Sequence, residues 1–408
     1  MSRSLRPRSL TWSQVAAWRL RRHHLADPLT APEPGDAVEG VASALCGVHA
    51  QVMSSAEQAV AARTRLPDAG AAVRAALWDD RRLVKTWAMR GTLHLLPAAE
   101  LPSYVAALRH DGRLLTERLL EQQGIAPRDV ELVLDALPEA LGGETLTREE
   151  LAERLGAVTG EETLGDKVRS GWGVLLKPAA RRGLLCFGPQ RGRNVTFCAP
   201  RYWLGGHGEP PGDAEPPHRA AVPDDAEPPG PARALGRVLE RYLRAYGPAA
   251  PDDFARWWGT GTPEVRAALR ELGDAVEATS VEGHRAWALR EDLEAMAVDR
   301  PAADDAPVVR LLPGFDPYVV GVSRQLASLL PDPALRTKVS RTAGWISPVL
   351  VVDGLIGGVW TARRSARRTE VEVEAFTPLR PGLRRRVAEE AETLLAASGD
   401  HEVAVRFA

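Results

Sequence analysis

Apolar residues recur at helical spacing near the start of the chain. In the segment at residues 11–25, Trp12, Val15 and Trp18 fall near one face, and Thr11 precedes them as an acceptable N-cap residue. The segment therefore predicts a helix that packs inward and turns its arginines outward. Similar patterns predict further helices at residues 38–48, 56–65, 71–78, 101–123 and 127–141.

Two of the segments between these helices are distinctive. Residues 47–55 have the polar content of a tight connection, and they contain the tripeptide His49-Ala50-Gln51. Residues 84–96 are rich in β-branched and aromatic side chains but are interrupted by Arg90-Gly91, which predicts a strand that turns or bulges. Because a winged helix ends in helix followed by strand, this order favours a winged helix.

A second unit with the same order begins near Thr145. Thr147 and Glu150 have the spacing of a capping box, and a helix is expected at about residues 171–182. Residues 184–187 and 195–198 then predict a β-hairpin whose tip carries Arg191 and Arg193. Helices followed by a hairpin with a basic tip are again typical of a winged helix.

The rest of the chain predicts a linker, a third winged helix and a β-rich end. Residues 205–232 are rich in Pro, Gly and acid, which is typical of a solvated linker. Asp353-Gly354 is a strong hairpin signal. Helices are expected at residues 235–246, 250–258, 263–272 and 381–397, a strand pair within 275–289, and strands at 308–312, 349–352, 355–363 and 369–376.

These elements predict an α+β protein with three tandem winged-helix units and a C-terminal β-barrel-like domain, which together form a curved DNA-binding scaffold. A length of 408 residues exceeds what one hydrophobic core normally organises, so several units are expected. The expected bounds are 1–125 and 126–204 for the first two winged helices, 205–232 for the linker, 233–300 for the third, and 301–408 for the β-rich domain with its closing helix.

Composition excludes several classes of protein. No apolar run approaches the roughly 20 residues that span a bilayer, so we expect a cytoplasmic protein without a membrane partner. Cys46, Cys186 and Cys198 are too few for a disulfide framework and lack zinc spacing, and we expect no metal or other cofactor. Cys186 and Cys198 could face each other across the hairpin, although two buried free thiols are favoured.

Charge is distributed unevenly although the net charge is only −2. That small total argues against indiscriminate coating of nucleic acid, but DNA binding needs only a basic face. The residues before Asp27 include no Asp or Glu. They include six arginines: Arg3, Arg6, Arg8, Arg19, Arg21 and Arg22.

Taken together, five segments resemble the tandem winged-helix DNA glycosylases of the AlkZ/YcaQ type, which unhook interstrand crosslinks and excise bulky alkylated purines. The block from Lys85 to Leu95 is the most specific. The segments are LTWSQVAAWRL, GVHAQ, LVKTWAMRGTLHLL, YGPAAPDDFARWWG and LLPGFDPYVVG, and they are distributed over nearly the whole chain.

The resemblance implies a catalytic tripeptide in the first unit at His49-Ala50-Gln51. In the best-known members this tripeptide is Gln-x-Gln or Gln-x-Asp, so Gln51 matches and His49 departs. The departure puts the substrate range in doubt more than the type of reaction, since the family also includes His-x-Gln members in antibiotic-producing bacteria. The implied partner is double-stranded DNA that contains alkylated purines, and we expect a monomer with no obligate protein partner.

The chemistry of an alkylated purine suits these two side chains. An N7- or N3-alkylated purine is already cationic, so its glycosidic bond is weak and the enzyme need only supply water. Gln51 can orient a water, and neutral His49 can accept its proton, since a free histidine has a pKa of about 6.5. We therefore expect a monofunctional, metal-independent glycosylase for N7-alkylguanine lesions, which would give resistance to a genotoxin that the host makes.

Candidate DNA-binding residues are arginines and one lysine on strands and turns. Arginine on a wing is a usual DNA contact, although a solvated turn is the plain alternative at each hairpin. Trp87 and His94 are expected in the core, and Asp316 is expected to cap a turn. The candidates are Lys85, Arg90, Arg191, Arg193, Arg363, Arg364, Arg367 and Arg368.

Two other functions compete with the glycosylase. A winged-helix protein that binds DNA without catalysis, as a regulator or a lesion-binding module, would retain DNA without forming product. A metal-dependent nuclease is poorly supported because carboxylates are not clustered at metal-binding spacing.

Overall fold

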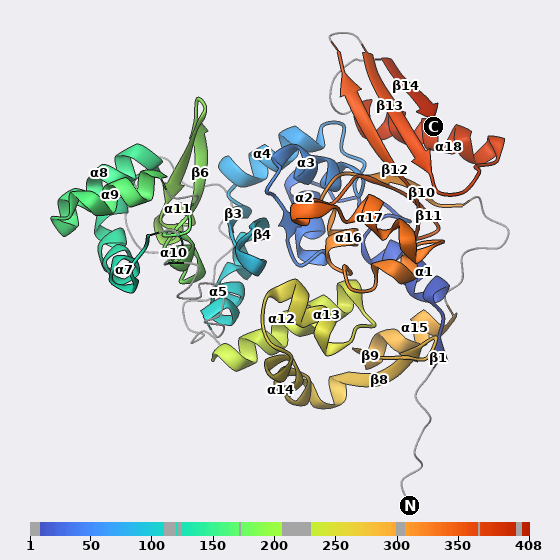
Figure 1. The fold of residues 1–408 in the computed structure, drawn as a ribbon, viewed down its shortest axis with the longest axis horizontal. Helices are drawn as coiled ribbons and strands as arrows, with labels where there is room; N and C mark the ends of the chain where they lie inside the picture. Colours follow the sequence, from blue (N-terminus) through green and yellow to red (C-terminus); the bar gives the residue numbers. More distant parts are fainter. Residues whose placement is uncertain are drawn as a thin grey trace, which may run out of the picture. The chain divides into compact units, whose positions relative to one another are not determined.

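Helices and strands are mixed along the chain, which gives an α+β protein (Figure 1). The computed structural model describes residues 9–109, 120, 122, 124–170, 173–205, 230–298, 307–365, 368–396 and 402–408. The contacts divide the chain into two units. One is formed by Met1–Val73 and Leu239–Ala408, and the other by Arg74–Val238.

The first helix of the first unit is the expected one, α1 (Trp12–Arg22). The Thr11 Oγ1 atom accepts from the Gln14 N–H at 3.2 Å, and the Gln14 side chain accepts from the Thr11 N–H at 2.9 Å. Val15 and Trp18 are buried on the inner face. The predicted N-cap and the predicted apolar face are both confirmed.

The next helices are displaced from their predicted bounds. Helix α2 is Pro34–Ala44 and begins early because proline is favoured in the first turn of a helix. It ends before a turn in which Cys46 and Gly47 have φ of 55° and 98°. The expectation that this helix extends to residue 48 is therefore wrong, because Val48–His49 forms the short strand β2. Helix α3 is Met53–Ala61.

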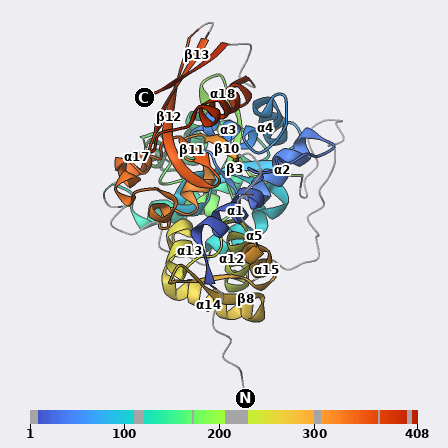
Figure 2. The same cartoon turned by 90° about the vertical axis from the view of Figure 1, so that its right-hand side faces the viewer.

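A five-stranded sheet forms the C-terminal part of the first unit, in the order β10-β11-β12-β13-β14 (Figure 1). It is an open half-barrel sheet whose edge strands are β10 and β14. Helix α18 (Pro381–Ala396) packs against both edge strands (Figure 2). The strands are β10 (Val309–Leu312), β11 (Val349–Val352), β12 (Leu355–Arg364), β13 (Arg368–Ala375) and β14 (Glu402–Phe407).

Pairing within this sheet explains one success and one failure of the sequence analysis. Asp353 and Gly354 form the predicted turn with φ of 49° and 82°, and a Cβ on Gly354 would lie 2.8 Å from Ala16. Both the positive φ and the close approach require glycine at that position. Strand β14, which pairs in parallel with β13, was not predicted because its short pattern follows the expected closing helix.

A smaller group of elements completes the first unit. Strands β8 and β9 form an antiparallel hairpin, and β1 joins β8 in parallel. The elements are β1 (Ser9–Leu10), α13 (Pro251–Trp258), α14 (Thr262–Leu272), β8 (Val276–Val281), β9 (His284–Leu289), α15 (Leu293–Val298), α16 (Pro317–Val320) and α17 (Arg336–Val339). Helices α4 (Ala69–Trp78) and α12 (Pro231–Tyr246) span the unit boundaries.

The second unit contains the predicted interrupted strand and the predicted hairpin. Strands β3 (Leu83–Trp87) and β4 (Leu93–Pro97) pair across a single turn of helix at Met89–Gly91. The other elements are α5 (Leu101–Arg109), α7 (Pro127–Leu141), β5 (Leu146–Thr147), α8 (Arg148–Thr159), α9 (Glu162–Ser170), α10 (Lys177–Arg181), β6 (Cys186–Arg191), β7 (Asn194–Cys198) and α11 (Pro200–Trp203).

Two helices of this unit depart from expectation. The helix expected at residues 171–182 is only α10, because Gly173 has φ of 78° and lies against Trp87, where a Cβ would approach the indole to 2.6 Å. Helix α9 was not predicted. Most of the expected helix beyond Arg109, and most of the expected linker, lie outside the described residues.

Three aromatic rings pack together within the mostly aliphatic core of the second unit. Trp87 packs edge-on against Phe187 with ring centroids 4.7 Å apart, and it stacks on Phe197 at 6.1 Å. Cys186 and Cys198 are buried free thiols with sulfur atoms 3.5 Å apart, as favoured from the sequence. Within the described part of the chain, no helix has the length and apolar character needed to cross a bilayer.

Candidate active site and nucleic-acid interface

His49 is held in a buried position on β2. Only 6% of its surface is exposed, and Ala50 beside it is fully buried. The description of this tripeptide as part of a polar loop is therefore wrong for its first two residues. Its imidazole stacks on the ring of Phe315, with centroids 5.0 Å apart and planes inclined by 11°. A nearly parallel aromatic neighbour at this distance restricts rotation of the imidazole.

Phe315 has a strained backbone. Its φ is +61°, a left-handed conformation that a bulky residue rarely adopts. The Asp316 N–H donates to the Pro313 carbonyl at 3.3 Å, so Phe315 occupies the third position of a tight turn where glycine is usual. Such strain costs about 1–3 kcal/mol and persists only where the surroundings impose it.

Asp316 and Arg63 impose this conformation. The Asp316 carboxylate accepts two hydrogen bonds from the Arg63 guanidinium, at 2.7 and 2.8 Å, and both side chains are completely buried. It also accepts from the Tyr318 N–H at 2.8 Å, so the predicted capping role is confirmed. The backbone beside Phe315 is thereby anchored to Arg63, two residues after the end of α3.

Gln51 differs from His49 in its exposure. Its side chain is on the surface, two residues before α3 begins at Met53. Val52 occupies the N-cap position and offers no side-chain acceptor to the first N–H groups of the helix. The start of α3 therefore presents a partial positive charge close to Gln51, which favours negative charge there.

Trp345 extends the aromatic contacts to the surface. Its ring meets Phe315 edge-on, with centroids 4.9 Å apart and planes at 75°. The residue remains 48% exposed, which is unusual for so large an apolar side chain. The backbone around it is a tight turn, because the Trp345 N–H donates to the Thr342 carbonyl and the Trp345 carbonyl accepts from the Arg341 N–H.

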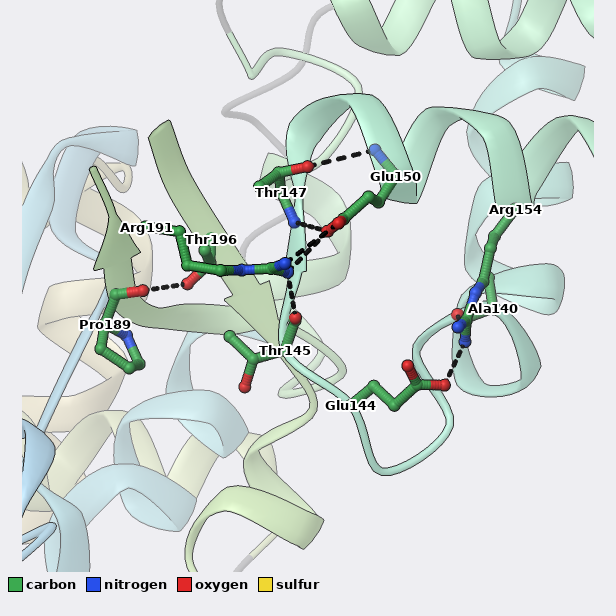
Figure 3. Close-up of polar contacts among 9 residues, drawn as sticks. All are labelled: Ala140, Glu144, Thr145, Thr147, Glu150, Arg154, Pro189, Arg191 and Thr196. Atoms are coloured by element: carbon green, nitrogen blue, oxygen red, sulfur yellow. Dashed lines mark hydrogen bonds and ion pairs between the residues drawn. The ribbon is translucent and has the colours of Figure 1, made fainter. Parts of the chain in front are cut away.

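Arg191 and Arg193 lie together on the hairpin β6–β7 but in different settings. Figure 3 shows the Arg191 guanidinium donating to both carboxylate oxygens of Glu150, at 2.6 and 3.0 Å, and to the Thr145 carbonyl at 2.5 Å. Glu150 also accepts from the Thr147 N–H, and these hydrogen bonds lower its pKa. Arg193 is exposed beside Gly192 at the turn.

A second basic cluster lies on the hairpin β12–β13. Arg363 and Arg364 end β12 and Arg368 begins β13, and all three are exposed. Arg363 lies opposite Glu370, which also pairs with Arg406 at 3.8 Å. The three arginines therefore lie near the same end of the hairpin, and one carboxylate, that of Glu370, lies opposite Arg363 on the neighbouring strand. Arg367 lies outside the described residues.

Lys85 and Arg90 lie in the second unit and are both half-buried. Lys85 is on β3 with its Nζ atom 5.7 Å from the centre of the Phe187 ring, and burial lowers its pKa. Arg90 has φ of 55° in the turn that interrupts the strand. His94 on β4 is 3% exposed, and Trp87 is 6% exposed, so the expectation that both lie in the core is confirmed.

Of the six arginines before Asp27, Arg3, Arg6 and Arg8 lie outside the described residues, and the other three divide into two groups. Arg19 is 1% exposed and donates to the carbonyls of Tyr246, Gly247 and Pro248, so the expectation that the arginines of α1 face outward is wrong for Arg19, which serves the fold. Arg21 and Arg22 line a cavity of about 410 Å³ with two arginines of α12, although Arg22 lies 3.7 Å from Asp292. The positive charge of the arginines around this cavity is therefore partly balanced by the Asp292 carboxylate.

Sequence reasoning missed Phe315, Trp345 and Arg63. For Phe315 the available signal was the segment LLPGFDPYVVG, in which only Asp316 was considered. Arg63 and Trp345 lie outside the five segments that resemble the family. Among the described residues, no group of three or more His, Cys, Asp or Glu side chains is arranged to hold a metal ion.

Comparisons with known proteins give the family. A family model described as DNA glycosylase AlkZ-like matches residues 42–397. An interstrand DNA cross-link repair glycosylase of Streptomyces sahachiroi is 39% identical over 353 residues, which cover 86% of this chain and 87% of that protein. The solved structure of the Streptomyces sahachiroi DNA glycosylase AlkZ matches with a TM-score of 0.83 and 37% identity, over 98% of this chain and all of the other. The chain therefore belongs to the AlkZ-like DNA glycosylases.

Proposed function

We propose that this DNA glycosylase is monofunctional and hydrolyses the N-glycosidic bond of bulky or crosslinked cationic alkylpurines of the N7-alkylguanine type. The name of the relative from Streptomyces sahachiroi, an interstrand DNA cross-link repair glycosylase, supports a crosslink as one substrate. The chemistry supports it as well. A cationic base is already a good leaving group, so the enzyme need only supply and activate water.

In this proposal His49 accepts the proton of the attacking water and Gln51 orients that water. The observation that carries it is the arrangement at β2: a buried imidazole stacked on Phe315, followed two residues later by an exposed amide. Positioned proton transfer of this kind contributes roughly 100- to 10,000-fold in rate. A contribution of that size suits an activated lesion and predicts little action on undamaged DNA.

The scaffold in this proposal is three tandem winged helices, within 1–125, 126–204 and 233–300, followed by the half-barrel sheet. The hairpins β3–β4, β6–β7 and β8–β9 each follow helices, as a wing does. Duplex DNA would be held by a single copy of the chain through the two basic hairpins and through Lys85 and Arg90. The alkylated base would be delivered to β2.

The test is direct. Duplexes that carry one of several N7-alkylguanine lesions are incubated with the protein, heated in base and examined for strand breaks at abasic sites. We expect breaks at each lesion, no breaks in the undamaged duplex, and no effect of EDTA. Normal DNA binding without abasic sites on any lesion would instead support a DNA-binding protein that lacks catalysis.

The same activity would give resistance to a genotoxic alkylating agent made by the host. Expression of the chain in a sensitive bacterium should raise survival under a bulky or crosslinking N7-alkylating agent, and a His49→Ala variant should not.

A further inference from the structure

His49, Phe315 and Trp345 form a continuous row of aromatic rings from the buried β2 strand to the surface. Adjacent centroids are 5.0 and 4.9 Å apart. The inner end is the proposed catalytic imidazole, and the outer end is an indole with half its surface open. Such a row can serve two purposes. Its exposed end can bind a ligand, and its inner rings can orient the catalytic side chain.

We propose that Trp345 is the surface on which the damaged purine stacks, and that Phe315 is a positioning residue that fixes the plane of His49. The proposal rests on the function proposed above for His49.

The preference follows from the electronics of the indole. A tryptophan ring attracts a cation over its face more strongly than tyrosine or phenylalanine does. An N7-alkylated guanine is a planar cation, so it gains both stacking and cation–π attraction, whereas an undamaged guanine gains stacking alone. Trp345 would therefore favour the alkylated base over a normal one.

The turn that carries Trp345 is held firmly enough for this role. Gly344 precedes it with φ of 75°, and the backbone hydrogen bonds with Arg341 and Thr342 close the turn. A Cβ on Gly314 would lie 3.1 Å from the Ile346 carbonyl, so the segment before Phe315 packs closely against the residue after Trp345. Arg341 is exposed on the same turn and adds positive charge that suits a nearby phosphate.

Phe315 acts on the reaction through His49. Its strained turn is kept by the buried Arg63–Asp316 pair, and the Phe315 ring lies nearly parallel to the imidazole. Loss of the flat ring would allow the imidazole to rotate, and poor alignment of a catalytic group can cost about 100-fold in rate. Binding of DNA should be unaffected.

The first arm of the test measures binding. The probes are a duplex with one 7-methylguanine on a 2′-fluoro sugar, which resists hydrolysis, and the matched undamaged duplex. Trp345→Ala should reduce the preference for the lesion by about tenfold, a size typical of one cation–π attraction, because stacking is lost on both duplexes alike. Trp345→Phe should keep part of the preference, and Leu355→Ala, an exposed apolar control, should keep all of it. Equal weakening on both duplexes, or no change, would overturn the role of Trp345.

The second arm measures single-turnover excision of 7-methylguanine from an ordinary duplex. Phe315→Leu should slow excision by about 10- to 100-fold with an unchanged Kd. Phe315→Tyr, which keeps the flat ring, should restore the rate to within about threefold, as ring stacking requires. Equal rates for the leucine variant and the wild type, or a loss that tyrosine does not restore, would overturn the positioning role.

The two arms separate this inference from the proposed function. Absence of excision by the wild type would defeat the proposed function and the positioning role together, whereas the binding arm would still decide the role of Trp345. Excision by the wild type with no effect of either substitution would leave the glycosylase proposal standing and defeat the inference alone.

Discussion

At the residue scale, protonation of the Glu390 carboxyl group affects the free energy of unfolding. It lies on α18, where it accepts from the Arg310 guanidinium and the Leu311 N–H, each at 3.3 Å. Burial raises the pKa of Glu390 to about 7, although both of these partners act in the opposite direction. Because the folded state holds this proton more tightly than the unfolded chain does, its contribution to stability is greatest below pH 4.5 and is lost as the pH rises to 7.

Glu390→Gln should remove this pH dependence. Between pH 5 and pH 8 the wild type should lose about 2 to 3 kcal/mol of unfolding free energy relative to the glutamine variant, since one pKa unit corresponds to about 1.4 kcal/mol. Urea denaturation of both proteins at the two pH values measures the difference. A difference that stays constant with pH would contradict the assignment.

Single residues also show where sequence reasoning stops. The tripeptide at His49 was found through its resemblance to a family, and Asp316 was identified as a cap from its place before Pro317. The burial of His49 was not predicted, because it depends on Phe315, which is 266 positions away along the chain. The left-handed φ of Phe315 has no signature in a residue that normally avoids it.

At the element scale, the hairpin β6–β7 carries one arginine that is held by an ion pair and one that is exposed at the turn. Arg191 is held by Glu150 and Thr145, which ties the end of β6 to the start of α8 (Figure 3). Arg193 is exposed at the turn. The sequence placed both at the tip of a wing but could not rank them, because the partner of Arg191 belongs to another element.

Substitution of these two arginines should have different effects. Arg193→Ala should weaken binding to an undamaged duplex and reduce the slope of log K against log salt by about 0.9, the value of one phosphate contact. Arg191→Ala should change the slope less and lower thermal stability more. Arg193→Lys is the matched control and should keep the slope. The opposite ranking of Arg191 and Arg193 would show that the hairpin meets DNA through its strand and not its turn.

Several elements were predicted because their signals are local. The N-cap at Thr11, the capping box at Thr147, the Asp353-Gly354 turn and the strands β12 and β13 depend on residues close together in the chain. Helix α9 and strand β14 escaped because short elements owe their stability to packing and pairing, which no local pattern records.

At the scale of the whole molecule, the α+β class and the C-terminal sheet were expected and are confirmed. The count of three winged helices and their bounds remain predictions. Contacts between residues divide the chain into two units, and in one of them Met1–Val73 join Leu239–Ala408. The parallel pairing of β1 with β8 is one reason, since it joins segments about 270 residues apart. Sequence periodicity carries no information about such distant pairing.

The central claim is that His49 and Gln51 act on one water to release an alkylated base. The most direct measurement is single-turnover excision of 7-methylguanine by the wild type, His49→Ala and Gln51→Ala, with the Kd for the hydrolysis-resistant duplex determined for each. We predict that each substitution slows excision by at least about 100-fold, the lower end of positioned proton transfer, while Kd changes little. Excision at wild-type rate by either variant, with the fold intact, would contradict the assignment of chemistry to that residue.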